Sequence, residues 1–265
     1  MKITTWNVNS VRTRLPHILD WLQANPVEVL CLQETKVTDE RFPRQAFEAI
    51  GYQVYVSGQK SYNGVALLSR SPLTEVTRGF LPILGETIDP SLDDQKRVIT
   101  GVTAAGVRVV NLYVPNGSAI GSEKYAYKLR WLATLRHYLA ALLPASPQLC
   151  VCGDFNIALE DRDIYDATDR ATHIMASDAE REALAAVLDL GLADAFRKFT
   201  SETGHFSWWD YRAASFRRNH GWRIDHHYLT PPLYEQAVAC TIDRTPRQWE
   251  KPSDHAPVTV EWVSG

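Results

Sequence analysis

Strand-like apolar runs arrive in groups along this chain, and amphipathic helices separate the groups. The spacing of apolar residues predicts helices over about 11–23, 43–50, 122–143 and 178–190. The expected strands are KITTW, VEVLCLQE, YQVYVSG, NGVALLSR, RVITGVT, VRVVNLYVP, QLCVCGDFN, HFSWWDY, RIDHHYL, AVACTI and APVTVEW. Because strands and helices do not simply alternate, the pattern favours an α/β fold in which two sheets pack face to face with helices outside.

The bulk composition predicts a single domain over residues 1–265. A chain of 265 residues that is 45% hydrophobic can bury one sizeable core, and no run resembles a linker. No apolar stretch is long enough for a signal peptide or a membrane span. The four cysteines form no CxxC pair and are expected to be buried and reduced. We therefore expect a cytoplasmic, monomeric protein without a membrane partner.

Polar side chains stand where the apolar strands end. A single Asp or Asn at such a position usually makes a turn or caps a helix. Repeated polar strand ends instead predict one shared crevice, since strand ends are where layered folds gather functional groups. A buried carboxylate is costly unless it is paired or bound to a metal. The residues concerned are Asn7, Glu34, Tyr113, Asn116, Asp154, Asn156, Asp225, Asp254 and His255.

Chain geometry suggests how some of these side chains pair. Asp154 and Asn156 are two residues apart, so on an extended chain they would face the same side and could share a ligand. Asp254 and His255 are adjacent and would point apart, so another acid should orient the imidazole. Asp225 is the candidate, because a carboxylate behind a histidine fixes its tautomer and favours its charged form.

The predicted metal is a hard cation. Several oxygen ligands beside one histidine suit Mg²⁺ or Mn²⁺, whereas zinc would require more histidine or cysteine ligands. His226 and His227 alternate faces on their strand and are interpreted as structural or surface residues.

The ordered set of motifs resembles the exonuclease III family of bacterial DNA-repair nucleases, which belongs to the endonuclease/exonuclease/phosphatase superfamily. The likeness spans nearly the whole chain and rests on TTWNVNS, LQETK, NGVALLSR, YVPNG, GSEKYAYKLRWL, GDFNIA, FSWWDYR, GWRID and KPSDHAPV. It implies a four-layer α/β/β/α sandwich of the deoxyribonuclease-I type. It also implies a magnesium-dependent hydrolase of base excision repair, with Mn²⁺ able to substitute.

The resemblance also implies activities and roles. The expected activities are 3′→5′ exonuclease and 3′-phosphatase or 3′-phosphodiesterase on double-stranded DNA with 3′ ends, with cleavage at abasic sites left open. Glu34 would be the main metal ligand, with Asn7 and Asp254 beside it. Asp154 would align or deprotonate the attacking water. The phosphate would meet Asn156, Tyr113 and the His255–Asp225 pair.

Residues 205–223 interleave aromatic side chains with arginines, a pattern typical of contacts to phosphates and unstacked bases. At least one of Phe206 and Trp208 is expected in the core. The resemblance implies that Trp208 and Trp222 line a pocket for the sugar beside the cut phosphate. Further candidate contacts to DNA are Asn116, Arg217 and, more weakly, Lys36, Arg97 and Lys124.

The loop at 161–177 departs from the abasic-site endonucleases of the family. It is acidic, and Met175 stands where those enzymes carry a small glycine. A bulky side chain there would obstruct a continuous strand, which favours work at 3′ ends over internal cleavage.

The net charge of −3 argues mildly against a nucleic-acid substrate, but this objection weakens if several acids form a metal site. Removing the four negative charges of Glu34, Asp154, Asp225 and Asp254 from the net −3 leaves +1 for the rest of the chain. Two alternatives stay open. One is a phosphatase or phosphodiesterase for lipid head groups, inositol phosphates or RNA, and the other is a non-catalytic nucleic-acid-binding module. The intact polar set argues against the second alternative.

Overall fold

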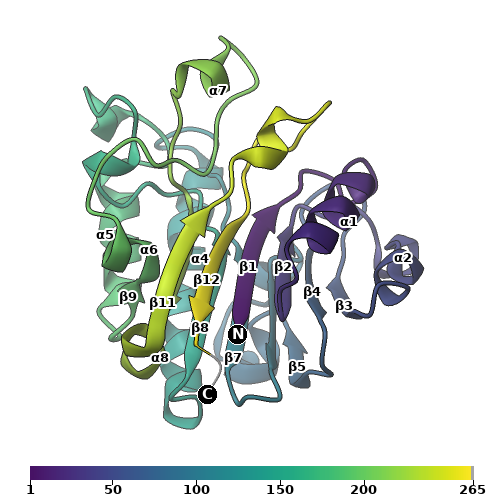
Figure 1. Ribbon diagram of the computed structural model, residues 1–265. Helices are drawn as coiled ribbons and strands as arrows, with labels where there is room; N and C mark the ends of the chain where they lie inside the picture. The colour runs from purple at the N-terminus through teal and green to yellow at the C-terminus, as the bar shows by residue number, and fades with distance from the viewer. Residues whose placement is uncertain (264–265) are drawn as a thin grey trace.

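The computed structural model describes residues 1–263 as two six-stranded sheets packed face to face (Figure 1). The first sheet has the strand order β11-β12-β1-β2-β4-β3. Its strands are β1 (Lys2–Asn7), β2 (Val29–Gln33), β3 (Gln53–Ser57), β4 (Val65–Ser69), β11 (Ala237–Ile242) and β12 (Val258–Trp262). The second sheet has the order β5-β6-β7-β8-β10-β9. Its strands are β5 (Thr74–Arg78), β6 (Val98–Val102), β7 (Arg108–Tyr113), β8 (Leu149–Asp154), β9 (Ala193–Asp194) and β10 (Asp225–Leu229).

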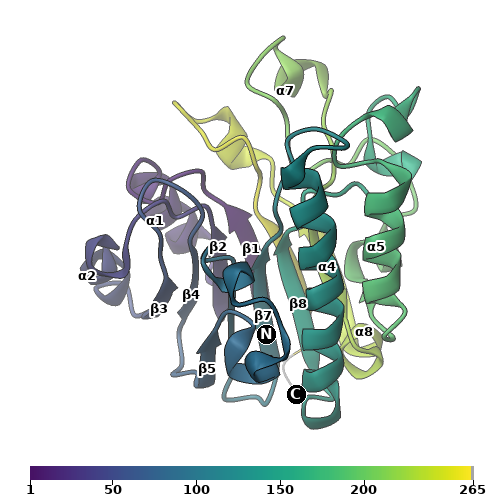
Figure 2. The same cartoon turned by 180° about the vertical axis from the view of Figure 1, so that it is seen from behind.

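Helices cover the outer face of each sheet, so the predicted α/β/β/α sandwich is confirmed. The first sheet carries α1 (Leu15–Ala24) and α2 (Arg44–Glu48), and the second carries α4 (Glu123–Leu142) and α5 (Asp178–Leu188), as Figure 2 shows from behind. Shorter helices are α3 (Leu81–Leu84), α6 (Ala195–Phe199), α7 (Ser215–Arg218) and α8 (Pro231–Gln236). No helix within residues 1–263 is both long and apolar enough to cross a bilayer.

Side-chain alternation along the strands builds three apolar layers. On β2, Val29 and Cys31 belong to the core between the sheets, whereas Leu30 and Leu32 pack toward the helices of the first sheet. The four cysteines of the chain all lie within the described residues, and they are buried and free, as predicted. The alternation is why an almost continuously apolar run such as VLCL reads as a strand buried on both faces.

The strand predicted at HFSWWDY is wrong. This segment is irregular and makes only isolated bridges, from Trp208 to Trp222 and from Trp208 to His255. The chain then turns where the backbone N–H of Arg212 donates to the Asp210 carboxylate. Aromatic residues raise strand propensity, but here they pack in different directions: Phe206 and Trp209 are buried, whereas Trp208 is only half-buried.

A buried ion cluster ties the loop after β8 to the start of β10. Arg223 Nε donates to Asp163 Oδ1 at 2.7 Å, and Arg197 contacts the same carboxylate. Burial alone would raise the pKa of Asp163, but the charge and hydrogen bonds of Arg223 lower that pKa to about 2. The pair therefore stabilises the fold above the unfolded pKa of about 3.9, and this contribution is lost as the pH falls toward 2.

Replacing Asp163 with Asn should lower the free energy of unfolding at pH 7 by ~3 kcal/mol, because the two arginines lose a buried partner. Urea denaturation measures this effect. The matched control is Asp161→Asn, which breaks an exposed ion pair to Arg181 and should cost less than about 1 kcal/mol. Equal stability of the two variants would contradict this account of the cluster.

Candidate active site

Strand direction brings the polar strand ends to one edge of the sandwich. β1 runs parallel to β2, and β7 runs parallel to β8, so their carboxyl ends lie together. β10 runs antiparallel to β8 and starts at this edge, with Asp225 opposite Asp154. Gly153 is needed for the close approach of β8 to β7. Its φ is +145°, and a Cβ atom there would lie 2.0 Å from the carbonyl oxygen of Leu112.

Asn7 links the two acids that end β2 and β8. Its Nδ2 donates to Glu34 Oε1 at 2.9 Å and to Asp154 Oδ2 at 2.8 Å. Its Oδ1 accepts from the backbone N–H of Asn9. Lys36 Nζ pairs with Glu34 Oε2 at 2.8 Å. Burial would raise the pKa of Glu34, but Lys36 and Asn7 lower it, so the carboxylate is ionised and attracts cations.

His255 is held by Asp225, the acid expected from chain geometry. The Nδ1 atom of His255 lies 2.9 Å from Asp225 Oδ2, and Ser207 Oγ donates to the same oxygen at 2.6 Å. His255 Nε2 then faces Asp154 Oδ2 at 3.7 Å. Burial disfavours the imidazolium, but the charges of Asp225 and Asp154 raise the pKa of His255 to about 10. The ring is therefore a hydrogen-bond donor at neutral pH.

Asp154 is buried, and its carboxyl is unusually basic. Desolvation raises its pKa to about 7, although the charge of His255 opposes this shift. Asn156 does not continue the strand, so the extended geometry predicted for this pair is wrong. Asn156 has φ 50°, and its backbone N–H donates to Asp154 Oδ1 at 2.9 Å. The left-handed turn lets the backbone, rather than the amide side chain, hold the acid.

Tyr113 and Asn116 form a second wall of the site. Burial and the charge of Glu34 raise the pKa of Tyr113 well above its usual value, so its hydroxyl stays a donor. Arg97 packs on the Tyr113 ring at 4.6 Å and donates to the Tyr113 carbonyl, so it supports the tyrosine from behind. Asn116 Nδ2 donates to Asn156 Oδ1 at 3.0 Å. Lys124 lines the adjoining pocket.

Asp254 lies at the edge of this group and does not join the acids. Its carboxylate accepts hydrogen bonds from Trp208 Nε1 at 3.0 Å and from Asn9 Nδ2 at 3.1 Å. In this arrangement Asp254 connects the site to Trp208, which lines the pocket described next.

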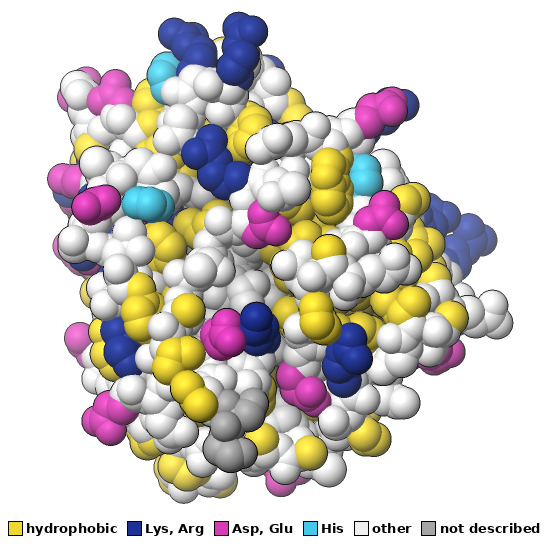
Figure 3. Space-filling model, viewed as in Figure 1, with side chains coloured by type: hydrophobic (Ala, Val, Ile, Leu, Met, Phe, Trp, Pro, Cys, Tyr) yellow, Lys and Arg dark blue, Asp and Glu magenta, His cyan; other side chains and the backbone are white. Residues whose placement is uncertain are grey.

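A tryptophan pocket of about 560 Å³ lies next to the site, and Trp208 of its lining donates to Asp254. Trp208, Trp222 and Met175 line it and pack together. Met175 has φ 72°, in the left-handed region where glycine is favoured. Arg218 lines the same pocket, whereas Arg217 is exposed on α7 outside it. Lys and Arg side chains gather over the α7 end of the molecule (Figure 3).

A buried ion pair beneath the site was not predicted. Lys128 Nζ contacts Glu180 Oε1 at 2.5 Å and donates to the Asn156 carbonyl at 2.8 Å. Glu180 also accepts from the backbone N–H of Met175 at 3.1 Å. The pair thus fixes Met175 relative to Asn156. Helical spacing carries a signal for it, since Lys128 falls between the apolar positions Tyr125 and Leu132 on the buried face of α4.

The donor set suits a hard cation of the magnesium type. Ligand atoms of Glu34, Asp154 and His255 lie within 4.8 Å of one another. Because His255 is protonated, the available ligands are carboxylate oxygens, and Mg²⁺ typically takes one or two of these and keeps several waters. Glu34 would hold the ion, with Asp154 at its side.

Comparison with known proteins agrees with this fold and site. The model of the endonuclease/exonuclease/phosphatase family matches residues 4–255. Exodeoxyribonuclease III of Haemophilus influenzae is 36% identical over 274 residues, covering 99% of this chain and 100% of that protein. A 3′ phosphatase from Neisseria, NExo, solved with a product DNA hairpin, matches with a TM-score of 0.93 at 40% identity. An AP endonuclease from Archaeoglobus fulgidus also gives 0.93, at 39% identity. Both structures cover all of this chain and are covered by it in full.

The two-sheet sandwich, with acids and the imidazole of His255 gathered at one edge, defines a phosphodiester-hydrolysing enzyme. The chain belongs to the endonuclease/exonuclease/phosphatase family and, within it, to the exonuclease III type of nuclease. The chain is similar to nearly the same degree to a 3′ phosphatase and to an AP endonuclease.

Proposed function

We propose that this chain is a Mg²⁺-dependent DNA-repair phosphodiesterase that works mainly at 3′ ends. It removes 3′-phosphates and other 3′ blocking groups and degrades duplexes in the 3′→5′ direction. Cleavage at internal abasic sites is its weak activity. The proposed preference for 3′ ends rests on Met175. This bulky residue has a glycine-like backbone conformation and lines the wall of the tryptophan pocket.

The hydrolytic step assigns a separate task to each side chain. Asp154, whose buried carboxylate is unusually basic, accepts the proton of the attacking water as the water oxygen bonds to phosphorus. The P–O3′ bond breaks, and the departing 3′ oxygen takes a proton from solvent. His255 donates from Nε2 to a phosphoryl oxygen as negative charge develops, and Asp225 keeps the ring charged and oriented. Tyr113 donates from its hydroxyl to the same phosphate. A bound Mg²⁺ would supply further neutralisation of phosphate charge.

The shape of the tryptophan pocket supports a terminal nucleotide as substrate. Trp208 and Trp222 offer flat faces to a sugar, and Met175 packs against them. Met175 thus acts as a wedge in the pocket wall. It is held in place by the hydrogen bond from its N–H to Glu180, which in turn pairs with Lys128. A terminal residue can enter beside such a wedge, whereas a strand that continues past the lesion would collide with it.

Replacing Met175 with Gly should raise the rate of internal abasic cleavage relative to 3′-phosphate removal by about tenfold, equivalent to ~1.4 kcal/mol. Glycine both removes the wedge and suits the φ of 72°. The assay compares kcat/KM on two end-labelled duplexes that differ only in the position of the lesion. Met175→Leu is the matched control, since it keeps the side-chain volume and should leave the ratio unchanged. An unchanged ratio in the glycine variant would count against the wedge.

A further inference from the structure

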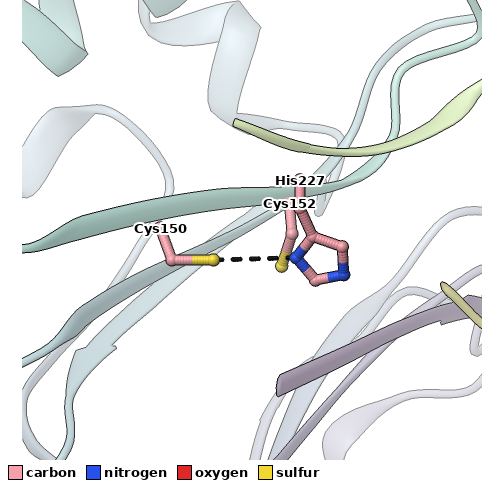
Figure 4. Close-up of side chains that lie close together, drawn as sticks. All are labelled: Cys150, Cys152 and His227. Atoms are coloured by element: carbon pink, nitrogen blue, oxygen red, sulfur yellow. Dashed lines mark hydrogen bonds between the residues drawn. The ribbon is translucent and has the colours of Figure 1, made fainter. Parts of the chain in front are cut away.

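Two cysteines and one histidine meet in the core between the sheets (Figure 4). Cys150 and Cys152 are two residues apart on β8 and so share a face, and His227 lies opposite Cys152 on the neighbouring β10. The Cys150 Sγ and His227 Nδ1 atoms are 3.7 Å apart, and the ligand atoms of all three residues lie within 4.8 Å of one another. All three side chains are fully buried.

The tautomer of His227 leaves a lone pair directed at the sulfur atoms. Its Nε2 atom lies 2.9 Å from the carbonyl oxygen of Val258 on β12. A carbonyl can only accept, so Nε2 carries the proton and Nδ1 is unprotonated in the neutral ring. An imidazole held in this way by a backbone carbonyl is the usual arrangement of a metal-ligating histidine.

We propose that Cys150, Cys152 and His227 form a structural zinc site in the inter-sheet core, distinct from the Mg²⁺ site at the strand ends. Tetrahedral Zn²⁺ with Zn–S of 2.3 Å and Zn–N of about 2.05 Å places sulfur and nitrogen about 3.6 Å apart. The observed 3.7 Å between Cys150 Sγ and His227 Nδ1 matches this separation.

Charge decides which ion the site takes. Two thiolates and a neutral imidazole cancel the charge of Zn²⁺, which matters in a fully buried position. Coordination replaces the two thiol protons, which pass to solvent. Mg²⁺ is excluded by its preference for oxygen ligands, and Cu⁺ would leave one negative charge in the core.

Cys31 on β2 of the facing sheet is available for the fourth position. Cys31 is fully buried in the same inter-sheet core as Cys152. It lies outside the group of three mutually close ligands, and a third thiolate would bury an extra negative charge. Cys31 is therefore expected to contribute least to zinc binding.

The proposed zinc site lies next to the catalytic residues along the same two strands. Cys152 precedes Asp154 by two residues on β8, and His227 follows Asp225 by two residues on β10. Zinc would therefore join the two strands that carry the general base and the acid behind the catalytic histidine. Its expected effect is on stability, because none of its ligands contacts the phosphate site.

The test measures metal in the full chain expressed in zinc-supplemented medium, since ions cannot reach a closed core after folding. After dialysis against EDTA, which strips the open Mg²⁺ site, about one zinc per chain should remain. Protein expressed with cobalt should show thiolate-to-cobalt charge-transfer absorption, which the oxygen ligands of the catalytic site cannot produce.

Variants assign the signal to these residues. Cys150→Ser, Cys152→Ser and His227→Phe should each lower retained zinc to less than about a tenth per chain. Cys31→Ser should reduce it only in part. Cys240→Ser, which changes a buried cysteine outside the cluster, is the matched control and should retain zinc fully.

The zinc content and cobalt spectrum of the wild-type protein test whether the site binds metal, even if a core variant fails to fold. Wild-type protein without EDTA-resistant zinc and without the sulfur–cobalt band would overturn the proposal. The cluster would then be a thiol–imidazole hydrogen bond alone. Zinc retained equally by wild type and by a folded Cys152→Ser variant would also overturn it.

Discussion

Asparagine in place of Asp154 should lower kcat for 3′-phosphate removal by roughly 10²–10⁴-fold, the contribution typical of a general base. The amide keeps the size of the side chain and one oxygen for the hydrogen bond from the Asn156 N–H. It has no basic carboxylate to take the proton of the attacking water. Because this role belongs to the transition state, the affinity for DNA should change little.

The assay for Asp154→Asn pairs single-turnover kinetics on a 3′-phosphate duplex with fluorescence anisotropy of the same duplex. Asp161→Asn, at an exposed carboxylate paired with Arg181, is the matched control for loss of one negative charge. Turnover within a factor of about two of wild type would exclude Asp154 as the base.

Replacing His255 with Gln should lower turnover by roughly 10²–10³-fold, the usual cost of losing one preorganised donor to a developing charge. Glutamine can still donate to the buried carboxylate of Asp225. Alanine would instead leave the charge of Asp225 without this partner and so destabilise the fold. The loss therefore reports the imidazolium itself rather than its packing.

A pH profile separates this catalytic role from a structural one. The wild-type rate should fall on the alkaline side as His255 loses its proton near pH 10. Asp225→Asn removes the charge that raises the pKa of His255, so the alkaline limb should move to lower pH. A profile unmoved by Asp225→Asn would contradict the pairing as the source of the raised pKa.

Much of the fold and site follows from local pattern. Grouped strands predicted packed sheets, and the sandwich puts parallel strand ends at one edge, which is why the polar ends gather there. The partner of His255 also followed from alternation, since Asp254 turns to Trp208 while Asp225 faces the imidazole. These inferences hold because strand periodicity fixes which way neighbouring side chains point.

Other features depend on tertiary contacts that local pattern does not encode. The left-handed backbone at Asn156 follows a regular strand without warning, so its extended geometry was predicted wrongly. Alternation correctly separated His226 from His227, but it could not show that His227 meets two cysteines of the adjacent strand. The contact between Lys128 and Glu180 joins two helices distant in sequence.

Divalent-ion dependence of hydrolysis tests the central claim most directly: carboxylates from distant strands, oriented by Asn7, hold a cation opposite one imidazolium. We expect no cleavage of an end-labelled 3′-phosphate duplex in EDTA and full recovery with Mg²⁺. Glu34→Gln, which loses the ionised ligand, should need about tenfold more Mg²⁺ for half-maximal rate. Cleavage that persists in excess EDTA, or an unchanged Mg²⁺ requirement in Glu34→Gln, would contradict the account.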